Sequence, residues 1–431
     1  MKRLLLLVFV LAGVTVACGG SDDKDSGASS SGPVKITFWH GQNQQSEKVL
    51  KDLVAKFNQS HPKIHVDVSS GGVLADQMLQ KVTAGLAAGS YPDVAYIFGS
   101  DVPNLVRSPK VADLTDAVKR PGWDWDDVYP AARSATTVNG RVRAAPALID
   151  DLAIVYNRKL FKAAGVPEPQ PGWTWDEFRA TAKRLTDHAK GVFGTGWPGV
   201  GDEDTVWRIW PLIWQLGGDI ATPDGKAVGF DGPSGLRALT LINDMATKDK
   251  SVYVDVKPGS EQMYQVFESG KMAMVPTGPW QLPEITEQKV DYGVVQMPSF
   301  SGKPTTISGP DTWMVLDNGD ARKAAAIEFV KWLGQPTQDA VWDQQAGSLP
   351  LRKATLQQPQ WQSALSDTPG MKVFVDELAN ARVRPALRAY PKVSQAMGQS
   401  IVSVLLGKAS PQDALKSAVD AGNTALSTSG P

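Results

Sequence analysis

Residues 35–68 read KITFWHGQNQQSEKVLKDLVAKFNQSHPKIHVDV, and this stretch decides the fold class. It opens with a short β-rich run at 35–40 and closes with residues 63–68, where apolar and polar side chains alternate as in a half-buried strand. Between them, the apolar residues of 49–57 recur at helical spacing and form one face, and Pro62 ends the helix. The stretch therefore predicts a strand, a helix and a second strand.

The same pattern repeats directly downstream. Residues 74–86 are amphipathic and predict a second helix closed by Gly89, and residues 93–98 (DVAYIF) predict a third strand. Strands that alternate with helices form an open, largely parallel sheet with helices on both faces. Ligands of such sheets lie beyond the carboxyl ends of the strands, where the loops 40–45 and 99–101 follow.

A second α/β unit is predicted to begin near residue 148. Thr174 and Glu177 have the spacing of a capping box and mark one of its helix starts. A strand at 312–316 and a helix at 321–333 return the chain to the first sheet. Pockets prefer the junction between two such lobes. The predicted elements of the second unit are strands at 152–156, 271–276 and 291–297 and helices at 175–187, 205–216, 234–247 and 260–269.

The N-terminal residues predict export and attachment to a membrane. Lys2 and Arg3 precede an apolar run at 4–16 that is too short to span a bilayer but suits a signal peptide. Cys18, the only cysteine, follows it directly, as in a bacterial lipobox, although Thr15 departs from the usual Leu or Val. We expect residues 1–17 to be a lipoprotein signal peptide, Cys18 to be lipidated, and residues 18–33 to be a flexible tether.

Composition and motifs favour binding over catalysis. The formal net charge of −1 gives no reason to expect nucleic acid as a partner, and 14 Trp against 8 Tyr and 12 Phe favour broad apolar contact. No G-x-S-x-G, P-loop, H-E-x-x-H or C-x-x-C motif occurs. His61 and His65 stand four apart, but Pro62 argues against a helix that would join them in a metal site. The carboxylates Asp150, Asp151, Asp202, Glu203 and Asp204 leave a glycosidase pair open.

Seven stretches, in order over nearly the whole chain, resemble the extracellular solute-binding proteins of family 1, the sugar-binding components of ABC importers typified by the maltose-binding protein. The most recognisable is FESGKMAMVPTGPW, residues 267–280. The others are ITFWHGQ, YPDVAYIFGSD, ALIDDLAIVYNRKLF, PGWTWDEF, WRIWPLIWQLGGDI and GSLPLRK.

The resemblance implies an α/β, type II periplasmic-binding-protein-like fold, with a mixed sheet flanked by helices in each lobe and a ligand cleft between the lobes. We expect an N-lobe from residues 34–147 plus about 311–357, and a C-lobe from 148–310 plus about 358–431. It also implies a monomer on the outer face of the cytoplasmic membrane, with a carbohydrate ligand, ABC permease subunits as partners and no cofactor or metal.

The resemblance also implies site residues. Trp280, on the turn opened by Gly278, matches a sugar-stacking Trp, and Asp150 matches a hydroxyl-binding acid; Trp280 plugging the interlobe core and Asp150 capping a turn remain structural alternatives. The remaining matches are Trp207 as a second stacking ring, Gln42 and Asn43 in the first ligand loop, Ser100 or Asp101 after the third strand, and Arg352 in the late turn. Residues placed for the cleft, each with a structural role as its alternative, are His40, Trp197, Asp202, Asp311, Trp313, Arg382 and Arg384.

The physical chemistry agrees with a sugar site. A sugar offers an apolar C–H face to a flat aromatic ring and a rim of hydroxyls to planar polar groups. One Trp and two or three hydrogen bonds to charged groups reach micromolar affinity, about −8 kcal/mol. The alternatives are an exported glycoside-active enzyme that uses Asp150 and a carboxylate of 202–204, and a binder of a peptide, polyamine or metal.

Overall fold

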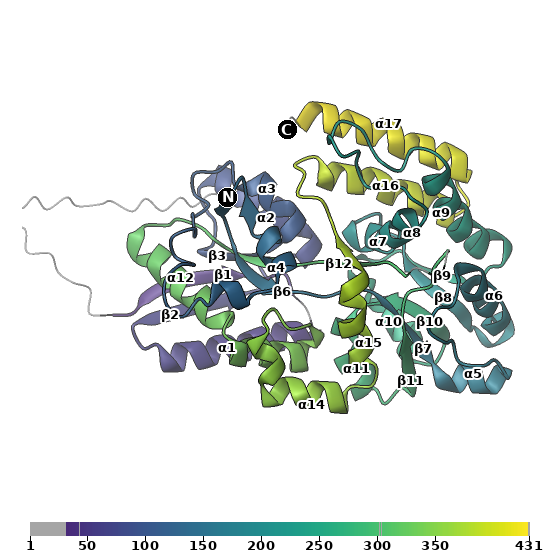
Figure 1. Cartoon of the computed structure of the whole chain (residues 1–431), viewed down its shortest axis with the longest axis horizontal. Helices are drawn as coiled ribbons and strands as arrows, with labels where there is room; N and C mark the ends of the chain where they lie inside the picture. The colour runs from purple at the N-terminus through teal and green to yellow at the C-terminus, as the bar shows by residue number, and fades with distance from the viewer. Residues whose placement is uncertain (1–31, 43, 301, 303, 430–431) are drawn as a thin grey trace, which may run out of the picture.

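The computed structural model describes residues 32–42, 44–300, 302 and 304–429. The predicted leader, the lipidation site Cys18, most of the tether and Asn43 lie outside the described residues. The described chain forms two α/β bodies side by side, which we call the N-lobe and the C-lobe (Figure 1). Within the described residues, none of the helices has the length and apolar character needed to cross a membrane.

The N-lobe is built on a five-stranded sheet. Its order is β2-β1-β3-β13-β6, with β1, β2 and β3 parallel and β13 antiparallel to both of its neighbours. The predicted strand–helix–strand–helix–strand pattern is therefore confirmed, and the late strand does return to this sheet. Its elements are β1 (Val34–Trp39), α1 (Gln44–Ser60), β2 (Ile64–Ser69), α2 (Met78–Ala88), β3 (Val94–Phe98), α3 (Val102–Leu105), α4 (Pro130–Ala135), β4 (Thr137–Val138), β5 (Arg141–Val142), β6 (Ala145–Leu148), β13 (Asp311–Val315), α12 (Asp320–Leu333) and α13 (Pro336–Trp342).

The C-lobe is built on a second five-stranded sheet, with the order β11-β7-β10-β8-β9. Strand β7 is antiparallel to β10 and β11, whereas β8 is parallel to β10 and β9. Its elements are β7 (Ala153–Asn157), α5 (Arg158–Ala164), α6 (Trp175–Leu185), β8 (Phe193–Pro198), α7 (Glu203–Trp207), α8 (Trp210–Gln215), α9 (Pro233–Asn243), β9 (Val252–Asp255), α10 (Glu261–Glu268), β10 (Met272–Thr277), α11 (Leu282–Glu287), β11 (Tyr292–Val295), α14 (Pro359–Asp367), α15 (Met371–Glu377), α16 (Tyr390–Leu405) and α17 (Pro411–Ser429).

Two predicted helices of the C-lobe are divided in the structure. The helix expected over 205–216 is split into α7 and α8, because Pro211 lacks an N–H and stands in the first turn of a new helix. The helix expected over 234–247 is α9 followed by a π-helical turn, Asp244–Lys248. The capping box at the start of α6 is confirmed, because Thr174 Oγ1 accepts from Glu177 N at 3.2 Å and Glu177 Oε2 accepts from Thr174 N at 2.7 Å.

The chain crosses between the lobes three times, and the crossings lie side by side. Ile149 O accepts from Leu349 N at 2.9 Å, which joins the first crossing to the third. Thr306 Oγ1 donates to Leu152 O at 2.7 Å, and Gly309 N donates to Asp150 O at 3.3 Å, which joins the first to the second. A short parallel pair of β12 (Thr306–Ser308) and β14 (Ala381–Val383) continues this strip. The exact lobe boundaries remain a prediction.

Candidate functional site

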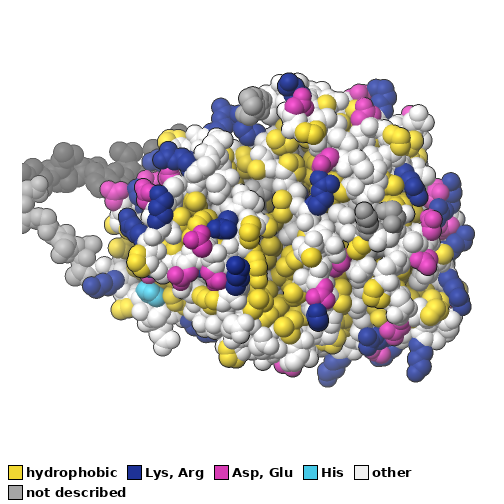
Figure 2. Space-filling model, in the orientation of Figure 1, with side chains coloured by type: hydrophobic (Ala, Val, Ile, Leu, Met, Phe, Trp, Pro, Cys, Tyr) yellow, Lys and Arg dark blue, Asp and Glu magenta, His cyan; other side chains and the backbone are white. Residues whose placement is uncertain are grey.

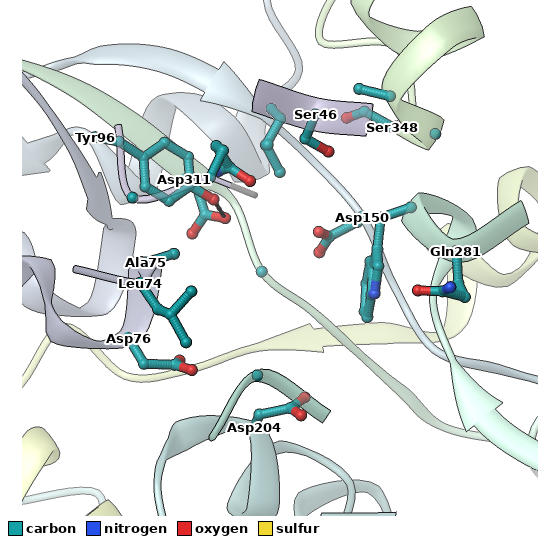
Figure 3. Close-up of a pocket in the computed structure, with 18 of the residues that line it drawn as sticks. Ser46, Leu74, Ala75, Asp76, Tyr96, Asp150, Asp204, Gln281, Asp311 and Ser348 are labelled. Carbon is teal, nitrogen blue, oxygen red and sulfur yellow. Dashed lines mark hydrogen bonds between the residues drawn. The ribbon is translucent and has the colours of Figure 1, made fainter. Parts of the chain in front are cut away.

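A cavity lies between the lobes, and its empty volume is about 1290 Å³ including the open mouth. The N-lobe contributes the start of α1, the loop at 74–76 and the end of β3, and the C-lobe contributes α7, α10 and the turn after β10. Figure 3 shows side chains from both lobes facing a shared space.

The turn at Gly278–Trp280 places one aromatic ring against the cavity. Pro279 opens the 3₁₀-helix η7 (Pro279–Gln281), and the Trp280 ring folds back over Gly278. An ideal Cβ on Gly278 would stand 1.8 Å from the ring carbon Cζ3 of Trp280. From the far side, Gly347 packs so closely that its ideal Cβ would stand 2.2 Å from Pro279 O. Two glycines therefore allow the close packing that holds Trp280 in place.

A second ring, Trp207, lies next to the first. It ends helix α7, whose N-cap Asp202 accepts from Thr205 N at 3.1 Å. The ring centroids of Trp207 and Trp280 are 5.5 Å apart, with their planes at 39°. Only 7% of Trp207 is exposed, yet its Nε1 has no hydrogen-bond partner. A buried indole N–H without a partner is unusual, and here it adjoins a cavity.

Arg384 stands between acids of both lobes. Its Nη1 is 3.1 Å from Glu203 Oε1 and its Nη2 is 3.7 Å from Asp311 Oδ1, and its guanidinium lies 5.2 Å from the centre of the Phe98 ring. Glu203 also accepts from Tyr390 Oη at 2.5 Å and from Ser394 Oγ. Burial opposes the charge of Arg384, but Glu203 and Asp311 outweigh it and raise the pKa of this guanidinium.

Burial dominates the titration of the surrounding acids. Asp311, the first residue of β13, accepts a hydrogen bond from Tyr96 Oη (Figure 3), and burial raises the pKa of this carboxyl to about 7 against the opposing charge of Arg384. Burial, then Asp311, raises the pKa of Asp150 well above its ordinary value. Burial, then Asp202, Asp204 and Glu203, does the same to the pKa of Asp76. The Oδ1 atoms of Asp150 and Asp311 have no hydrogen-bond partner.

The structure brings seven of the predicted site residues to this cavity and leaves the others elsewhere. Gln42, Asp150, Trp207, Trp280, Asp311 and Arg384 line the cavity, and Gly278 shapes it from behind Trp280. Ser100 and Asp101 are buried just outside the described lining, in η2 (Gly99–Asp101). Burial, then Glu203, raises the pKa of Asp101 to about 7. The charge of Glu203, a residue of the cavity lining, therefore also affects Asp101.

The remaining predicted residues have structural partners away from the lining. Trp313 is 3% exposed in the N-lobe core, where its ring centroid is 5.3 Å from that of Phe38. Arg352 is 3% exposed and donates from Nη1 to Trp123 O at 2.7 Å. The others are Trp197, which donates from Nε1 to Thr205 O at 3.0 Å, Asp202, which caps α7, and Arg382, whose Nη2 is 2.7 Å from Asp219 Oδ2 on the surface.

His40 does not face the cavity either. It is fully buried, and its Nδ1 accepts from Gln42 N at 2.9 Å. Burial lowers its pKa to about 4, so the ring is neutral at pH 7. His40 therefore fixes the backbone of the loop that carries Gln42.

The sequence interpretation missed part of the lining. Asp76 lies in η1 (Ala75–Gln77), after the Gly71-Gly72 turn that follows β2, and a loop at a strand end was a signal for it. Tyr96 and Phe98 lie in β3, where a buried strand gives no such signal. Glu203 and Asp204 were noted only as hydrolase candidates. Further lining residues are Gln44, Gln45, Ser46, Leu74, Tyr264, Gln281, Glu284, Trp342 and Ser348.

The described residues contain no group of three or more His, Cys, Asp or Glu side chains arranged to hold a metal ion. The described lining presents paired aromatic rings beside carboxylates, hydroxyls, amides and one guanidinium.

Comparison with known proteins gives consistent matches. A family model described as bacterial extracellular solute-binding protein matches residues 41–340. The sn-glycerol-3-phosphate-binding periplasmic protein UgpB of Pectobacterium atrosepticum is 26% identical over 420 residues, covering 93% of this chain and 93% of that protein.

Two solved structures share the fold over nearly their whole length. The cyclic alpha-maltosyl-1,6-maltose binding protein of Arthrobacter globiformis has a TM-score of 0.73 and 29% identity, covering 92% of this chain and 99% of that one. The ABC substrate-binding protein Lmo0181 of Listeria monocytogenes, solved with cycloalternan, has a TM-score of 0.83 at 22% identity, with coverage of 92% and 99%. At 22% identity the likeness shows the fold, which has two lobes as expected.

Proposed function

The chain belongs to the bacterial extracellular solute-binding protein family, and we propose that it captures a carbohydrate between its lobes and delivers it to an ABC permease. The observation that carries the proposal is the ring pair Trp207 and Trp280 beside polar atoms that lack partners. A sugar's C–H face fits flat rings, and its hydroxyls both donate and accept. Trp207 Nε1, Asp150 Oδ1 and Asp311 Oδ1 are suited to such hydroxyls.

The printed names of two relatives support a saccharide as the solute class. The Arthrobacter globiformis protein is named for a cyclic maltosyl sugar, and the Listeria monocytogenes protein was solved with cycloalternan. The solute in the name of the Arthrobacter globiformis protein, a maltosyl-maltose, contains more than one sugar ring. We therefore propose an oligosaccharide as the solute.

We propose that the solute leaves chemically unchanged. A hydrolytic mechanism would pair Asp150 with a carboxylate of 202–204, and those three are already engaged: Asp202 caps α7, and Glu203 accepts from Tyr390 and Ser394. Asp204 Oδ1 is 2.5 Å from Arg208 Nη1 and its Oδ2 accepts from Ser260 Oγ. A general acid and base must instead be free to exchange protons with the substrate.

Capture is proposed to proceed by closure of the lobes. The three adjacent crossings are short and joined to one another by hydrogen bonds, as expected of a hinge. Asp150 lies in the first crossing and lines the cavity, so a solute that contacts it also contacts the hinge. Because both lobes contact the solute only when closed, binding shifts the population toward the closed form.

The proposed place of action is the outer face of the cytoplasmic membrane. The family is extracellular, and a lipid on Cys18 followed by a tether would hold the lobes near the permease. Replacement of Cys18 by Ala, followed by membrane fractionation of the producing cell, tests the anchor: release of the protein from the membrane fraction is expected, and retention would contradict it.

Isothermal titration calorimetry against a panel of mono- and oligosaccharides tests the function. We expect at least one saccharide to bind with micromolar or better affinity and to be recovered intact by mass spectrometry. Cleavage of the bound sugar would show that the protein is an enzyme. Absence of binding to every member of the panel would overturn the proposal.

A further inference from the structure

The charges around the cavity are unbalanced. The described lining holds six carboxylates and a single cationic side chain, Arg384; neither Lys nor His occurs among these lining residues. The chain as a whole has 44 Lys and Arg against 45 Asp and Glu, and both signs are interspersed over the face shown in Figure 2. The excess of acid is therefore local to the cavity. The six acids are Asp76, Asp150, Glu203, Asp204, Glu284 and Asp311.

The one cation is already committed to the protein's own acids. Arg384 lies 3.1 Å from Glu203 Oε1 and 3.7 Å from Asp311 Oδ1. An ideal Cβ on Gly309 would stand 3.1 Å from Arg384 Nη2 and 3.2 Å from Asp150 Oδ1, so Asp150 adjoins the same group. Glu203 and Asp311 thus share one guanidinium, and Asp150 lies close enough to be affected by its charge. Recognition of phosphate by charged side chains uses Arg or Lys that is free to point at the phosphate, and the described lining has none to offer.

Several of the acids have an oxygen without a hydrogen-bond partner. Asp311 is 5% exposed, and its Oδ1 has no hydrogen-bond partner; the Oδ1 of Asp150 is likewise buried and unpartnered. Within the described residues Asp76 forms neither a hydrogen bond nor an ion pair, and its carboxylate points into the space that Asp150 and Asp204 also face (Figure 3). Buried carboxylates without partners either take up protons or require a bound cation. Neutral hydroxyls hydrogen-bond to them but do not balance their charge.

We propose that the solute is a saccharide that carries a protonated amine, that Asp150 and Asp311 accept its ammonium group, and that phosphorylated solutes are excluded. This inference rests on the proposed function, because the two rings bind the sugar face and the acids then select among sugars. An ammonium at this position would add a second positive charge beside Arg384, opposite the three acids Asp150, Glu203 and Asp311. A phosphate would add negative charge to an acid-rich cavity and would meet no free cation.

Matched sugars provide the test. Calorimetry at pH 7.5 compares glucosamine disaccharides and trisaccharides, in α-1,4 and β-1,4 linkage, with the corresponding glucose saccharides and with sn-glycerol 3-phosphate. We expect at least one amine-bearing member to bind ten-fold or more tightly than its neutral counterpart, and sn-glycerol 3-phosphate to give no binding heat.

The variant Asp150→Asn isolates the charge, because the amide still hydrogen-bonds to hydroxyls. We expect it to lower the ratio of amine to neutral affinity five-fold or more, and the ratio is compared whatever the change in neutral affinity. Asp52→Asn, at an exposed position on α1, is the control and should leave the ratio unchanged. The ratio cancels any general loss of binding that comes from altered folding.

The outcomes separate the two proposals. Neutral saccharides that bind as tightly as the amine-bearing ones, or an unchanged ratio in Asp150→Asn, overturn this inference and leave the proposed function standing. Binding of sn-glycerol 3-phosphate overturns the exclusion of phosphate. Failure of every saccharide overturns the proposed function and this inference with it.

Discussion

Trp207 and Trp280 meet with ring centroids 5.5 Å apart although they stand 73 positions apart in the sequence, with α8, α9 and α10 between them. One ring ends a helix and the other follows a strand, so each is held by a different element of the C-lobe. Two tilted rings at the edge of a cavity form a bent apolar plate. Such a plate suits a ring-shaped solute better than a straight aliphatic chain.

Replacement of Trp280 by Ala should weaken saccharide binding at least ten-fold, about 1.4 kcal/mol, because one of the two rings is lost. The melting temperature should change little, since Trp280 is only partly buried. Calorimetry and differential scanning fluorimetry measure the two quantities. The Kd of Trp280→Phe, which keeps a smaller ring, should lie between those of wild type and Trp280→Ala. An unchanged Kd in Trp280→Ala would remove this ring from the site.

Gly278→Ala should reproduce much of the Trp280→Ala defect. The added Cβ would stand 1.8 Å from the indole ring, so the ring must leave its position. Gly32→Ala is the matched control, because nothing lies within 4 Å of its added Cβ. Titration of saccharide into both variants tests the idea. Wild-type affinity in Gly278→Ala would show that the ring position does not matter.

Arg384→Met should destabilise the protein strongly, and Arg382→Met should not. Breaking a buried ion pair costs about 3–5 kcal/mol, whereas an exposed pair such as Arg382 with Asp219 contributes about 0–1 kcal/mol. Urea unfolding of both variants at pH 7.5 gives the comparison. Equal stability of the two variants would contradict the buried role of Arg384.

The Arg384→Met defect should shrink as the pH falls. Burial has already raised the pKa of Asp311 to about 7, and loss of the opposing cation raises it further. A carboxyl whose pKa is higher in the folded protein than in the unfolded chain, near 3.9, gives stability that is lost as pH rises through the folded value. The difference in free energy of unfolding between Arg384→Met and wild type should thus be smaller at pH 5 than at pH 8.

Asp343→Asn should stabilise the protein at pH 8 and have little effect at pH 5. Asp343 is fully buried, neither of its oxygens has a hydrogen-bond partner, and burial, then Asp339, raises its pKa well above the ordinary value. The folded state therefore holds the proton more tightly, so stability falls as pH rises, and the amide removes this dependence. We expect the melting temperature at pH 8 to rise by roughly 1–3 °C relative to wild type. A constant difference across pH 5 to 8 would contradict this.

Arg352→Met should lower the melting temperature by several degrees and leave saccharide affinity within about two-fold of wild type. Arg352 donates to the carbonyls of Trp123 and Asp124 from a buried position, and hydrogen bonds of charged groups contribute roughly 1.5–3 kcal/mol. A large loss of affinity without loss of stability would restore Arg352 to the ligand site.

The sequence pattern was sufficient for β1, β2, β3 and β13 of the N-lobe sheet, for β7, β10 and β11 of the C-lobe sheet and for the turn at Trp280, because alternation and turn chemistry are local. It did not predict β6, β8 or β9. It was insufficient where the position of a residue along a strand decides whether its side chain lines the cavity or lies in the core. Asp311 and Trp313 lie two residues apart on one face of β13, yet Asp311 lines the cavity and Trp313 lies in the core. Arg352 is similar: its carbonyl partners at Trp123 and Asp124 are more than 200 residues away along the chain, beyond the reach of spacing arguments.

The late position of β13 affects how the chain folds. Tyr96 and Asp311 bond across β3 and β13 although 215 positions separate them, and β6 joins the N-lobe sheet only through β13. Until residue 315 has been delivered, one edge of β3 stays open and β6 has no neighbour in that sheet. Such distant pairing makes folding slow. For the exported chain that we propose, this delay keeps the first sheet open until residues 311–315 have also crossed the membrane.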